Sequence, residues 1–162
     1  MTAVFNSSPI IFLSKLNLME KVLSLFESIY IPELVIEEVL SKKDESSKVL
    51  VELLKGNKLV KVKGKNKRLF RALNKTLGKA ESEVIVYAIE NEKESVAILD
   101  DYVARREALK LGLKVKGTLG IIKRLYELKE VSSDPKDLYK RLMSVHFRVK
   151  EKIFKEIFKE WY

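Results

Sequence analysis

The side chains of this sequence that are best suited to chemistry are three carboxylates, Glu38, Glu81 and Asp101. Asn6 and Thr118 could add an amide and a hydroxyl oxygen to them. The chain has no cysteine and one histidine, which excludes thiolate zinc sites, disulfides and a cysteine nucleophile. Oxygen donors of this kind are the ligands that Mg²⁺ and Mn²⁺ prefer. We therefore expect a Mg²⁺ or Mn²⁺ site if the fold brings these positions together.

Positive charge is concentrated in one part of the chain. Residues 55–79 contain eight lysines, two arginines and no acidic residue, which exceeds the whole formal net charge of +9. Such a segment can attract the phosphates of a nucleic acid. A solvated, lysine-rich surface explains the same composition equally well.

Short apolar runs alternate with segments of helical periodicity along the chain. The runs predict strands at residues 3–5, 28–31, 59–62, 95–99 and 113–116. Helices are predicted from Ser8-Pro9 onward, with Ser8 as N-cap, and at residues 18–26, 32–41, 48–55, 66–74, 79–91, 102–111, 117–129, 133–144 and 149–161, with a charged turn at 42–47. This order predicts an α/β fold with three α/β/α layers and a central, mainly parallel sheet of four to five strands.

Polar residues follow three of the predicted strands. Asn6 ends the first strand, Asp100 and Asp101 follow the fourth, and Thr118 follows the fifth. Parallel sheets bind their ligands beyond the carboxyl ends of the strands. These side chains are therefore expected at one edge of the sheet.

Helical spacing predicts which acids of the helices point inward. Glu81 shares a helix face with Val84, Ile85 and Ala88, whereas Glu83 is expected to point away from that face. An acid on an apolar face is costly unless it is paired, protonated or bound to a metal. Glu81 is therefore a candidate metal ligand.

The helix that begins near Pro32 contains a second candidate. Glu38 is expected beside Leu34 and Val35 at the edge of the apolar face, while Glu37 is turned nearly opposite. This spacing predicts that Glu38, rather than Glu37, points towards the site.

The chain length of 162 residues predicts a single domain, residues 1–162, in which residues 134–162 form a C-terminal helical extension. Phe154, Phe158 and Trp161 recur at helical spacing and predict a helix that docks on the domain or on a second copy. The sequence shows neither a run of about 20 apolar residues nor a secretory signal. We therefore expect a cytoplasmic protein without membrane contact.

Five segments, in this order, resemble the motifs of the PIN-domain family of metal-dependent ribonucleases, in particular prokaryotic relatives of VapC toxins. They are a strand with a polar end, a Pro-led helix with an inward Glu, a helix with an acid near its start, an apolar strand leading to Asp, and a Gly-Thr turn, at residues 4–11, 31–39, 78–85, 97–106 and 117–120. The resemblance covers roughly residues 3–125.

The resemblance implies an endoribonuclease in which bound Mg²⁺ or Mn²⁺ activates water to cleave RNA phosphodiester bonds. It implies that the metal is held by the catalytic acids Glu38, Glu81 and Asp101, with Asn6 and Asp100. A polar lining would come from Ser7, Ser8 and Thr118. Contacts with the RNA backbone would come from Lys65, Lys67, Arg68, Arg71, Lys79, Arg105 and Arg106. The resemblance further implies a toxin with a small antitoxin partner, and a homodimer.

The sequence departs from the family pattern at its first acid, usually Asp, which is Asn6 here. An amide oxygen can bind a hard cation but brings no negative charge, so metal affinity and water activation should fall. The alternative function is a catalytically impaired PIN-fold module that binds nucleic acid or protein. In two further alternatives, the acids are unconnected surface groups, and Arg105 and Arg106 belong to a salt-bridged helix surface.

Overall fold

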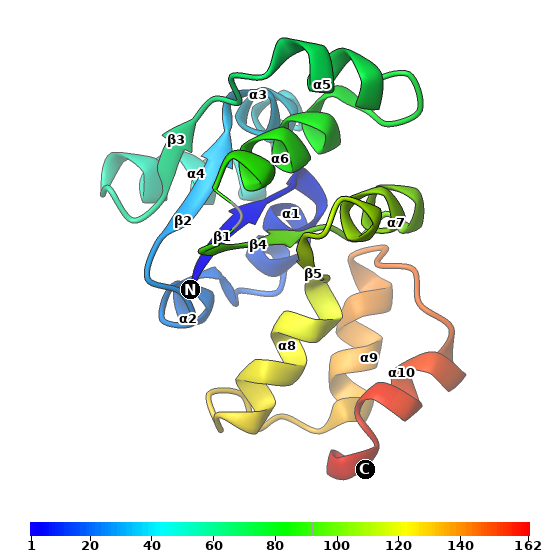
Figure 1. The fold of residues 1–162 in the computed structure, drawn as a ribbon. Coiled ribbons are helices and arrows are strands. Elements are labelled where there is room, and N and C mark those ends of the chain that lie inside the picture. The colour runs from blue at the N-terminus through cyan, green and yellow to red at the C-terminus, as the bar shows by residue number, and fades with distance from the viewer. Residues whose placement is uncertain (92) are drawn as a thin grey trace.

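Five short strands form one parallel sheet in the computed structural model, which describes residues 1–91 and 93–162. The strands are β1 (Thr2–Phe5), β2 (Ile29–Pro32), β3 (Val60–Val62), β4 (Ser95–Ile98) and β5 (Lys114–Lys116). Their order across the sheet is β3-β2-β1-β4-β5, and every neighbouring pair is parallel (Figure 1). The predicted α/β architecture and the five predicted strands are confirmed.

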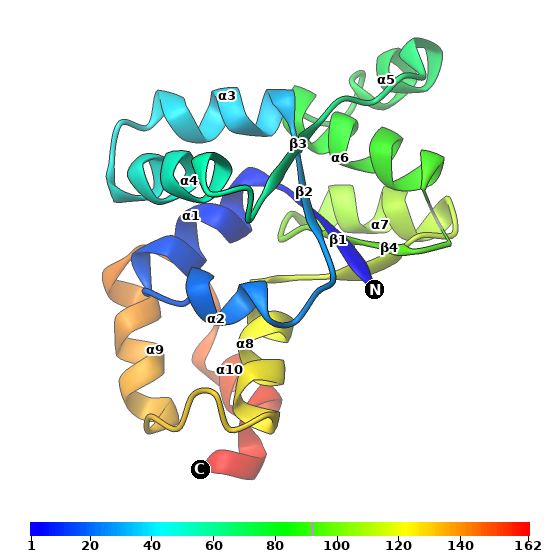
Figure 2. The same ribbon diagram turned by 90° about the vertical axis from the view of Figure 1, so that its left-hand side faces the viewer.

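Helices cover both faces of the sheet, because the chain must cross over between successive parallel strands. They are α1 (Ser7–Lys15), α2 (Met19–Leu23), α3 (Glu33–Ser41), α4 (Glu45–Lys55), α5 (Lys67–Leu73), α6 (Lys79–Glu90), α7 (Tyr102–Lys110), α8 (Thr118–Glu127), α9 (Pro135–Ser144), α10 (Glu151–Ile157) and the 3-10 helix η1 (Lys159–Trp161). Figure 2 shows α6 and α7 on one side of the sheet and α1, α2 and α4 on the other, which confirms the three layers. None of the described helices is long and apolar enough to cross a membrane.

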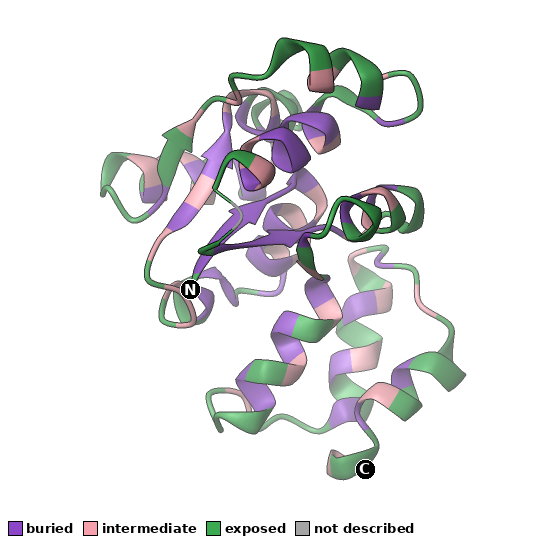
Figure 3. Ribbon diagram, in the orientation of Figure 1, coloured by how far each residue is buried: buried purple, intermediate pink, exposed green. Residues whose placement is uncertain are grey.

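The middle of the sheet is buried and its edges are exposed. Every residue of β1 and β4 is buried, as expected for parallel strands that are covered on both faces. The edge strands β3 and β5 expose lysines instead (Figure 3). The best-packed strands are therefore the two that lead to Asn6 and Asp100.

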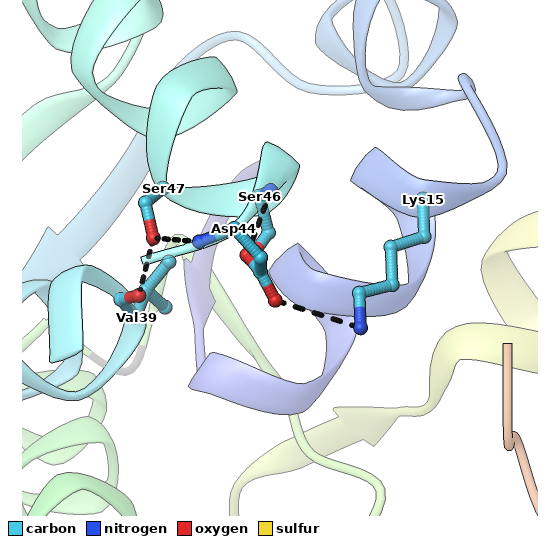
Figure 4. A network of polar contacts seen from close by, with 5 residues as sticks. All are labelled: Lys15, Val39, Asp44, Ser46 and Ser47. Atoms are coloured by element: carbon cyan, nitrogen blue, oxygen red, sulfur yellow. Dashed lines mark hydrogen bonds and ion pairs between the residues drawn. The ribbon is translucent and has the colours of Figure 1, made fainter. Parts of the chain in front are cut away.

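α4 begins at Glu45, inside the segment 42–47 that was predicted to be a charged turn. The Asp44 carboxylate accepts a hydrogen bond from the Ser46 backbone N–H at 3.0 Å, and the Asp44 N–H donates to Ser47 Oγ at 3.4 Å (Figure 4). This reciprocal cap supplies partners for the free N–H groups of a helix start. The predicted turn is confirmed at residues 42–44 and was wrong for 45–47, because it rested on charge and overlooked the capping residues.

The same cap connects three helices. The Ser47 hydroxyl donates to the Val39 carbonyl of α3 at 2.8 Å, and the Asp44 carboxylate pairs with Lys15 of α1 at 3.5 Å (Figure 4). The hydrogen bond from the Ser46 hydroxyl, and to a smaller extent the charge of Lys15, lower the pKa of Asp44. The charged form of Asp44 therefore stabilises this junction.

Three other helix ends differ from the sequence prediction. α1 starts at Ser7, so Asn6 rather than Ser8 occupies the N-cap position. The predicted helix 18–26 shortens to α2, and the last helix, predicted at 149–161, divides into α10 and η1. Periodicity located these helices, but capping and packing set their ends.

The last helices pack on the rest of the chain through aromatic rings. Phe158 and Trp161 each lie against Tyr126 of α8, with ring centroids 5.5 Å apart. Phe154 packs against Tyr139 of α9 at 5.0 Å. Of the two predicted docking surfaces for the C-terminal helix, the structure shows the one on its own chain.

Candidate metal and active site

Asn6 stands at the carboxyl end of the central strand β1. It is 5% exposed, and its backbone N–H donates to the Ile98 carbonyl of β4 at 3.0 Å. Among the described residues, neither Asn6 Oδ1 nor the buried Ser7 Oγ has a hydrogen-bond partner, and Ser8 next to them is half-buried. Burial removes the hydrogen bonds of an oxygen to water, which costs free energy unless another partner replaces them. This position therefore suits a bound cation or water.

Glu81 lies in the first turn of α6 and is half-buried. Its Oε2 accepts a hydrogen bond from the Gly78 N–H at 3.4 Å. Burial raises the pKa of Glu81, and the negative charges of Asp101 and Glu38 raise it further, whereas the bond from Gly78 lowers it. Val84, predicted on the same helix face, is buried, whereas Glu81 at the start of the helix is only half-buried.

The negative charges of two predicted acids, Asp101 and Glu38, therefore act on a third, Glu81. Glu38 lies on α3 and Asp101 directly precedes α7, and both helices contact α6. In the described part of the chain, none of these three acids forms an ion pair with a lysine or arginine. We call Glu38, Glu81 and Asp101, together with Asn6, the acid cluster. Its uncompensated negative charge is what a divalent cation would neutralise.

Glu38 differs from the prediction in its exposure. Its side chain is exposed, rather than held at the edge of the apolar face of α3. Val35 and Val39 fill the core from that helix instead. The effect of Glu38 on the site is electrostatic: its negative charge raises the pKa of Glu81.

Asp101 is the N-cap residue of α7. Its Oδ2 accepts a hydrogen bond from the Ala104 backbone N–H at 2.9 Å, and the residue is exposed. An N-cap Asp typically contributes about 1 kcal/mol to a helix. Asp101 therefore stabilises α7 in addition to its candidate role in the site.

Asp100 and Thr118 form a separate, self-sufficient pair. The Asp100 Oδ1 accepts the Thr118 N–H and its Oδ2 accepts the Thr118 hydroxyl, each at 2.7 Å. Burial raises the pKa of Asp100, whereas these bonds and the charge of Arg105 lower it. A Cβ atom on Gly117 would lie 2.5 Å from Arg105 Nη1 and 3.0 Å from Asp100 Oδ1, so glycine leaves room for both side chains as they stand. Both oxygens of Asp100 are engaged, which leaves Asp101 better placed than Asp100 to accept a cation.

Glu83 is a carboxylate that sequence reasoning misplaced. The prediction that it points away from the buried side of α6 was wrong: it is 5% exposed. Its Oε1 accepts the Leu34 N–H at the start of α3 at 2.9 Å, and its Oε2 accepts the Gly64 N–H after β3 at 3.4 Å. An apolar periodicity cannot reveal this role, because the partners of Glu83 are backbone groups.

Glu90 extends this arrangement by two turns along α6. Its Oε1 accepts the backbone N–H groups of Lys65 and Asn66 at 2.7 and 2.9 Å. We call Glu83 and Glu90, with the residues 64–66 that they hold, the linker anchor. The linker anchor fixes the start of α5, and with it the basic segment, on α6.

Six of the seven residues predicted to contact RNA are exposed, namely Lys65, Lys67, Arg68, Arg71, Lys79 and Arg106. No acid in the described residues pairs with any of them. Three lie on α5, which buries only Leu73 and stands at the outside of α6 (Figure 1). The seventh, Arg105, is half-buried and donates to the Leu99 carbonyl at 3.1 Å. The exposed cations remain available for phosphates.

The acid cluster contains oxygen donors for a hard cation, but these donors do not form a complete coordination site. In the described part of the chain, no group of three or more His, Asp or Glu side chains is already arranged to hold a metal ion. The buried amide oxygen of Asn6 and the half-buried Glu81 nevertheless lack competing partners of opposite charge. This oxygen-only donor set fits Mg²⁺ or Mn²⁺.

Comparison with known proteins gives one result that bears on this site. A family model for a PIN domain matches residues 2–162 of the chain. No curated protein matches it. The matched range includes the whole sheet, the acid cluster and the C-terminal helices.

Proposed function

The chain belongs to the PIN-domain family, which has a nuclease-type fold, and we propose that it is an endoribonuclease that depends on Mg²⁺ or Mn²⁺ held at the acid cluster. One observation carries the proposal. The half-buried Glu81 has its pKa raised by burial and by two further acids, and no basic residue in the described chain pairs with it. Acids gathered in this way, at a cost to the fold, are typical of functional sites.

The residues of the acid cluster would have different roles in binding a metal ion. Glu81 and Asp101 would supply the charged ligands, and the buried Asn6 oxygen would supply a neutral one. A divalent cation bound there polarises a phosphodiester and activates water for in-line attack. One oxygen of each carboxylate accepts a backbone hydrogen bond, from Gly78 to Glu81 at 3.4 Å and from Ala104 to Asp101 at 2.9 Å.

Positive charge lies on α5, which contacts α6, and at the start of α6 itself. Lys79 precedes Glu81 by two residues, and Lys67, Arg68 and Arg71 are exposed on α5. These side chains would hold the backbone of a nucleic acid without reading its sequence. The choice of RNA over DNA rests on the resemblance to VapC-type ribonucleases.

The decisive variant is Asp101→Asn, because asparagine is as good an N-cap residue as aspartate. It removes one charge from the acid cluster while keeping an acceptor for the Ala104 N–H. Asp134→Asn is the matched control, since Asp134 caps α9 in the same way through the Lys136 N–H at 2.9 Å. In a Mn²⁺-dependent cleavage assay on structured RNA, Asp101→Asn should lose activity and Asp134→Asn should keep it. Equal activity of the two variants would refute the proposal.

Metal binding can be measured without catalysis. A cation that binds the folded state raises the melting temperature according to its affinity. Mn²⁺ should therefore stabilise the wild type and the Asp134→Asn variant but not Asp101→Asn or Glu81→Gln. A Mn²⁺ effect that is the same in all four proteins would place the cation elsewhere.

Asn6 favours a second candidate function, a PIN-fold module that binds nucleic acid or protein but has lost hydrolysis. The amide supplies no charge where the family pattern has an acid, which weakens both metal binding and water activation. Asn6→Asp separates the two functions. If only Asn6→Asp cleaves RNA, the binding module is the native function; if the wild type cleaves as well, the ribonuclease is.

The resemblance to VapC toxins extends the proposal to a toxin with a small antitoxin partner, acting as a homodimer. An active toxin should arrest the growth of a bacterial host on induced expression. Asp101→Asn should relieve the arrest, and Asp134→Asn should not. Arrest by all variants alike would show that toxicity, if any, is unrelated to the acid cluster.

A further inference from the structure

One tyrosine differs from the others in its surroundings. The chain has six tyrosines. Five of them pack against another aromatic ring, namely Tyr30, Tyr87, Tyr126, Tyr139 and Tyr162. Tyr102 is 70% exposed and has no aromatic neighbour within the described structure. The fold does not use its ring for packing.

The position of Tyr102 suggests another use for the ring. Tyr102 is the first residue of α7 and directly follows Asp101 of the acid cluster. The residues that anchor α7 in the core are Ala104 and Ala108, so the helix does not depend on an aromatic residue at its start. Tyr102 therefore follows Asp101 of the acid cluster directly, four residues beyond the carboxyl end of β4.

Arg106 lies one helical turn further along α7 and faces this ring. Its guanidinium carbon is 5.6 Å from the centroid of Tyr102. The attraction between the cation and the ring orients the tyrosine. Arg106 has no acidic partner among the described residues, so its charge remains available for a phosphate.

We propose that Tyr102 positions the substrate by stacking on an unpaired base of an RNA strand whose phosphodiester lies at the acid cluster. The inference rests on the proposed function and adds to it a positioning residue that acts on RNA unpaired at the cleaved position. Base stacking on an aromatic ring tolerates any sequence, because every base has a flat face. A base inside a duplex cannot reach the ring, since its faces are covered by its neighbours.

A second copy of the chain is the competing occupant of this surface. Val103 and Leu109 are also exposed on α7 and could contribute to an interface. However, α7 contains Arg105, Arg106 and Lys110 against a single acid, Glu107. A two-fold interface would place this excess positive charge opposite itself, which is unfavourable. The same charges complement RNA.

The test measures binding without catalysis, so that it does not depend on cleavage. A fluorescent, single-stranded oligoribonucleotide is titrated with the full chain in EDTA, and its anisotropy is recorded. Tyr102→Phe should bind within about twofold of the wild type, and Tyr102→Ala should bind roughly 5- to 100-fold more weakly, the range that corresponds to the loss of one base stack. The control Tyr162→Ala, which removes another exposed ring, should bind as the wild type does. A duplex of the same sequence should not distinguish Tyr102→Ala from the wild type.

A photochemical readout locates the contact. An oligoribonucleotide that carries 5-iodouridine crosslinks to aromatic side chains stacked on the modified base. Mass spectrometry of the wild type should find the crosslink at Tyr102, and Tyr102→Ala should lose it. A crosslink at a different residue overturns the inference.

The remaining outcomes separate the inference from the proposed function. If Tyr102→Ala binds the single strand as tightly as Tyr102→Phe, or if the wild type binds no RNA, the inference is wrong. If light scattering shows that Tyr102→Ala turns a dimer into a monomer without changing RNA affinity, the ring belongs to an interface and the inference is also wrong. If the wild type crosslinks at Tyr102 but Mn²⁺ produces no cleavage, the proposed nuclease fails while the stacking site stands.

Discussion

Helix α6 carries carboxylates on two faces, and their surroundings differ. On one face, Glu81 meets two further acids of the acid cluster, and burial raises its pKa. On the other, Glu83 of the linker anchor is more deeply buried, yet both of its oxygens accept backbone N–H groups. The comparison separates two uses of an acid two residues apart in sequence. Both oxygens of Glu83 have backbone partners within the fold, whereas Glu81 accepts one long hydrogen bond from Gly78 and lies in the field of two further negative charges.

The largest expected effect is a loss of activity on substitution of Glu81, which tests whether Glu81 and Glu83 have different roles. Glu81→Gln removes the charge of an expected metal ligand and should lower the rate of Mn²⁺-dependent RNA cleavage by at least about 100-fold, equivalent to about 2.7 kcal/mol of transition-state stabilisation. Glu83→Gln should retain the rate to within a few fold, when the rate is expressed per folded molecule. Initial rates at saturating Mn²⁺ provide the measurement. Similar losses in both variants would mean that the two faces of α6 do not differ in function.

For the stability of the fold, substitution of Glu83 should have a larger effect than substitution of Glu81. Glu83→Ala leaves the half-buried N–H groups of Leu34 and Gly64 without their partner, which should cost about 2 kcal/mol. Glu81→Ala should cost less than about 1 kcal/mol, because it also relieves repulsion within the acid cluster. Urea unfolding at neutral pH, with equal slopes for the variants, measures the difference. A smaller loss for Glu83→Ala than for Glu81→Ala would reverse the assignment of the two faces.

The residues on the two faces of α6 also differ in how well their positions can be predicted from the sequence. The apolar runs predicted the five strands, because buried parallel strands are apolar throughout, and their alternation with helices predicted a mainly parallel sheet. The ends of those strands and the periodicity of α6 then placed Asn6, Asp101 and Glu81 at one edge. These predictions depend on local patterns of apolar residues, which one sequence displays directly.

The linker anchor could not be predicted in this way. Glu83 and Glu90 bind backbone N–H groups, which every residue except proline has, so their partners leave no mark in the sequence. Gly64 gives a partial signal, because a Cβ atom there would lie 2.8 Å from Val86 Cγ1 on α6. That glycine indicates a close approach but not the residue it approaches. The exposed position of Glu38 was missed for a related reason, since it lies at the boundary of an apolar face.

A smaller effect is expected at the outer end of the linker anchor. Glu90→Ala removes the acceptor for the N–H groups of Lys65 and Asn66, but these groups are exposed and can bond to water. The loss of stability should therefore be only about 0.5–1 kcal/mol. Amide hydrogen exchange should accelerate at residues 65–73 and remain unchanged in β1 and β4. Acceleration across the whole chain would show that Glu90 supports the global fold rather than the placement of α5.

The smallest expected effect is a dependence of stability on pH that has opposite signs for two acids. The pKa of Glu81 is raised above its ordinary value of 4.5, chiefly by burial. Its contribution to stability is therefore fully present below pH 4.5 and is lost as the pH rises through the folded-state pKa. The pKa of Asp44 is lowered from 3.8, chiefly by the Ser46 hydroxyl. Its contribution is present above pH 3.8 and is lost as the pH falls through the folded-state pKa.

Urea unfolding of the wild type, Glu81→Gln and Asp44→Asn at about pH 7, 4.5 and 3 measures both contributions. Between about pH 7 and 4.5, the wild type should gain stability relative to Glu81→Gln, because only the wild type can take up the proton. Below pH 3.8, the wild type should lose its advantage over Asp44→Asn. Saturating Mn²⁺ at pH 7 should stabilise the wild type over Glu81→Gln, because the cation compensates the charge that the fold leaves unpaired. If Glu81 instead behaves like Asp44, the acid cluster is held by bonds within the protein, and its charge is not reserved for a cation.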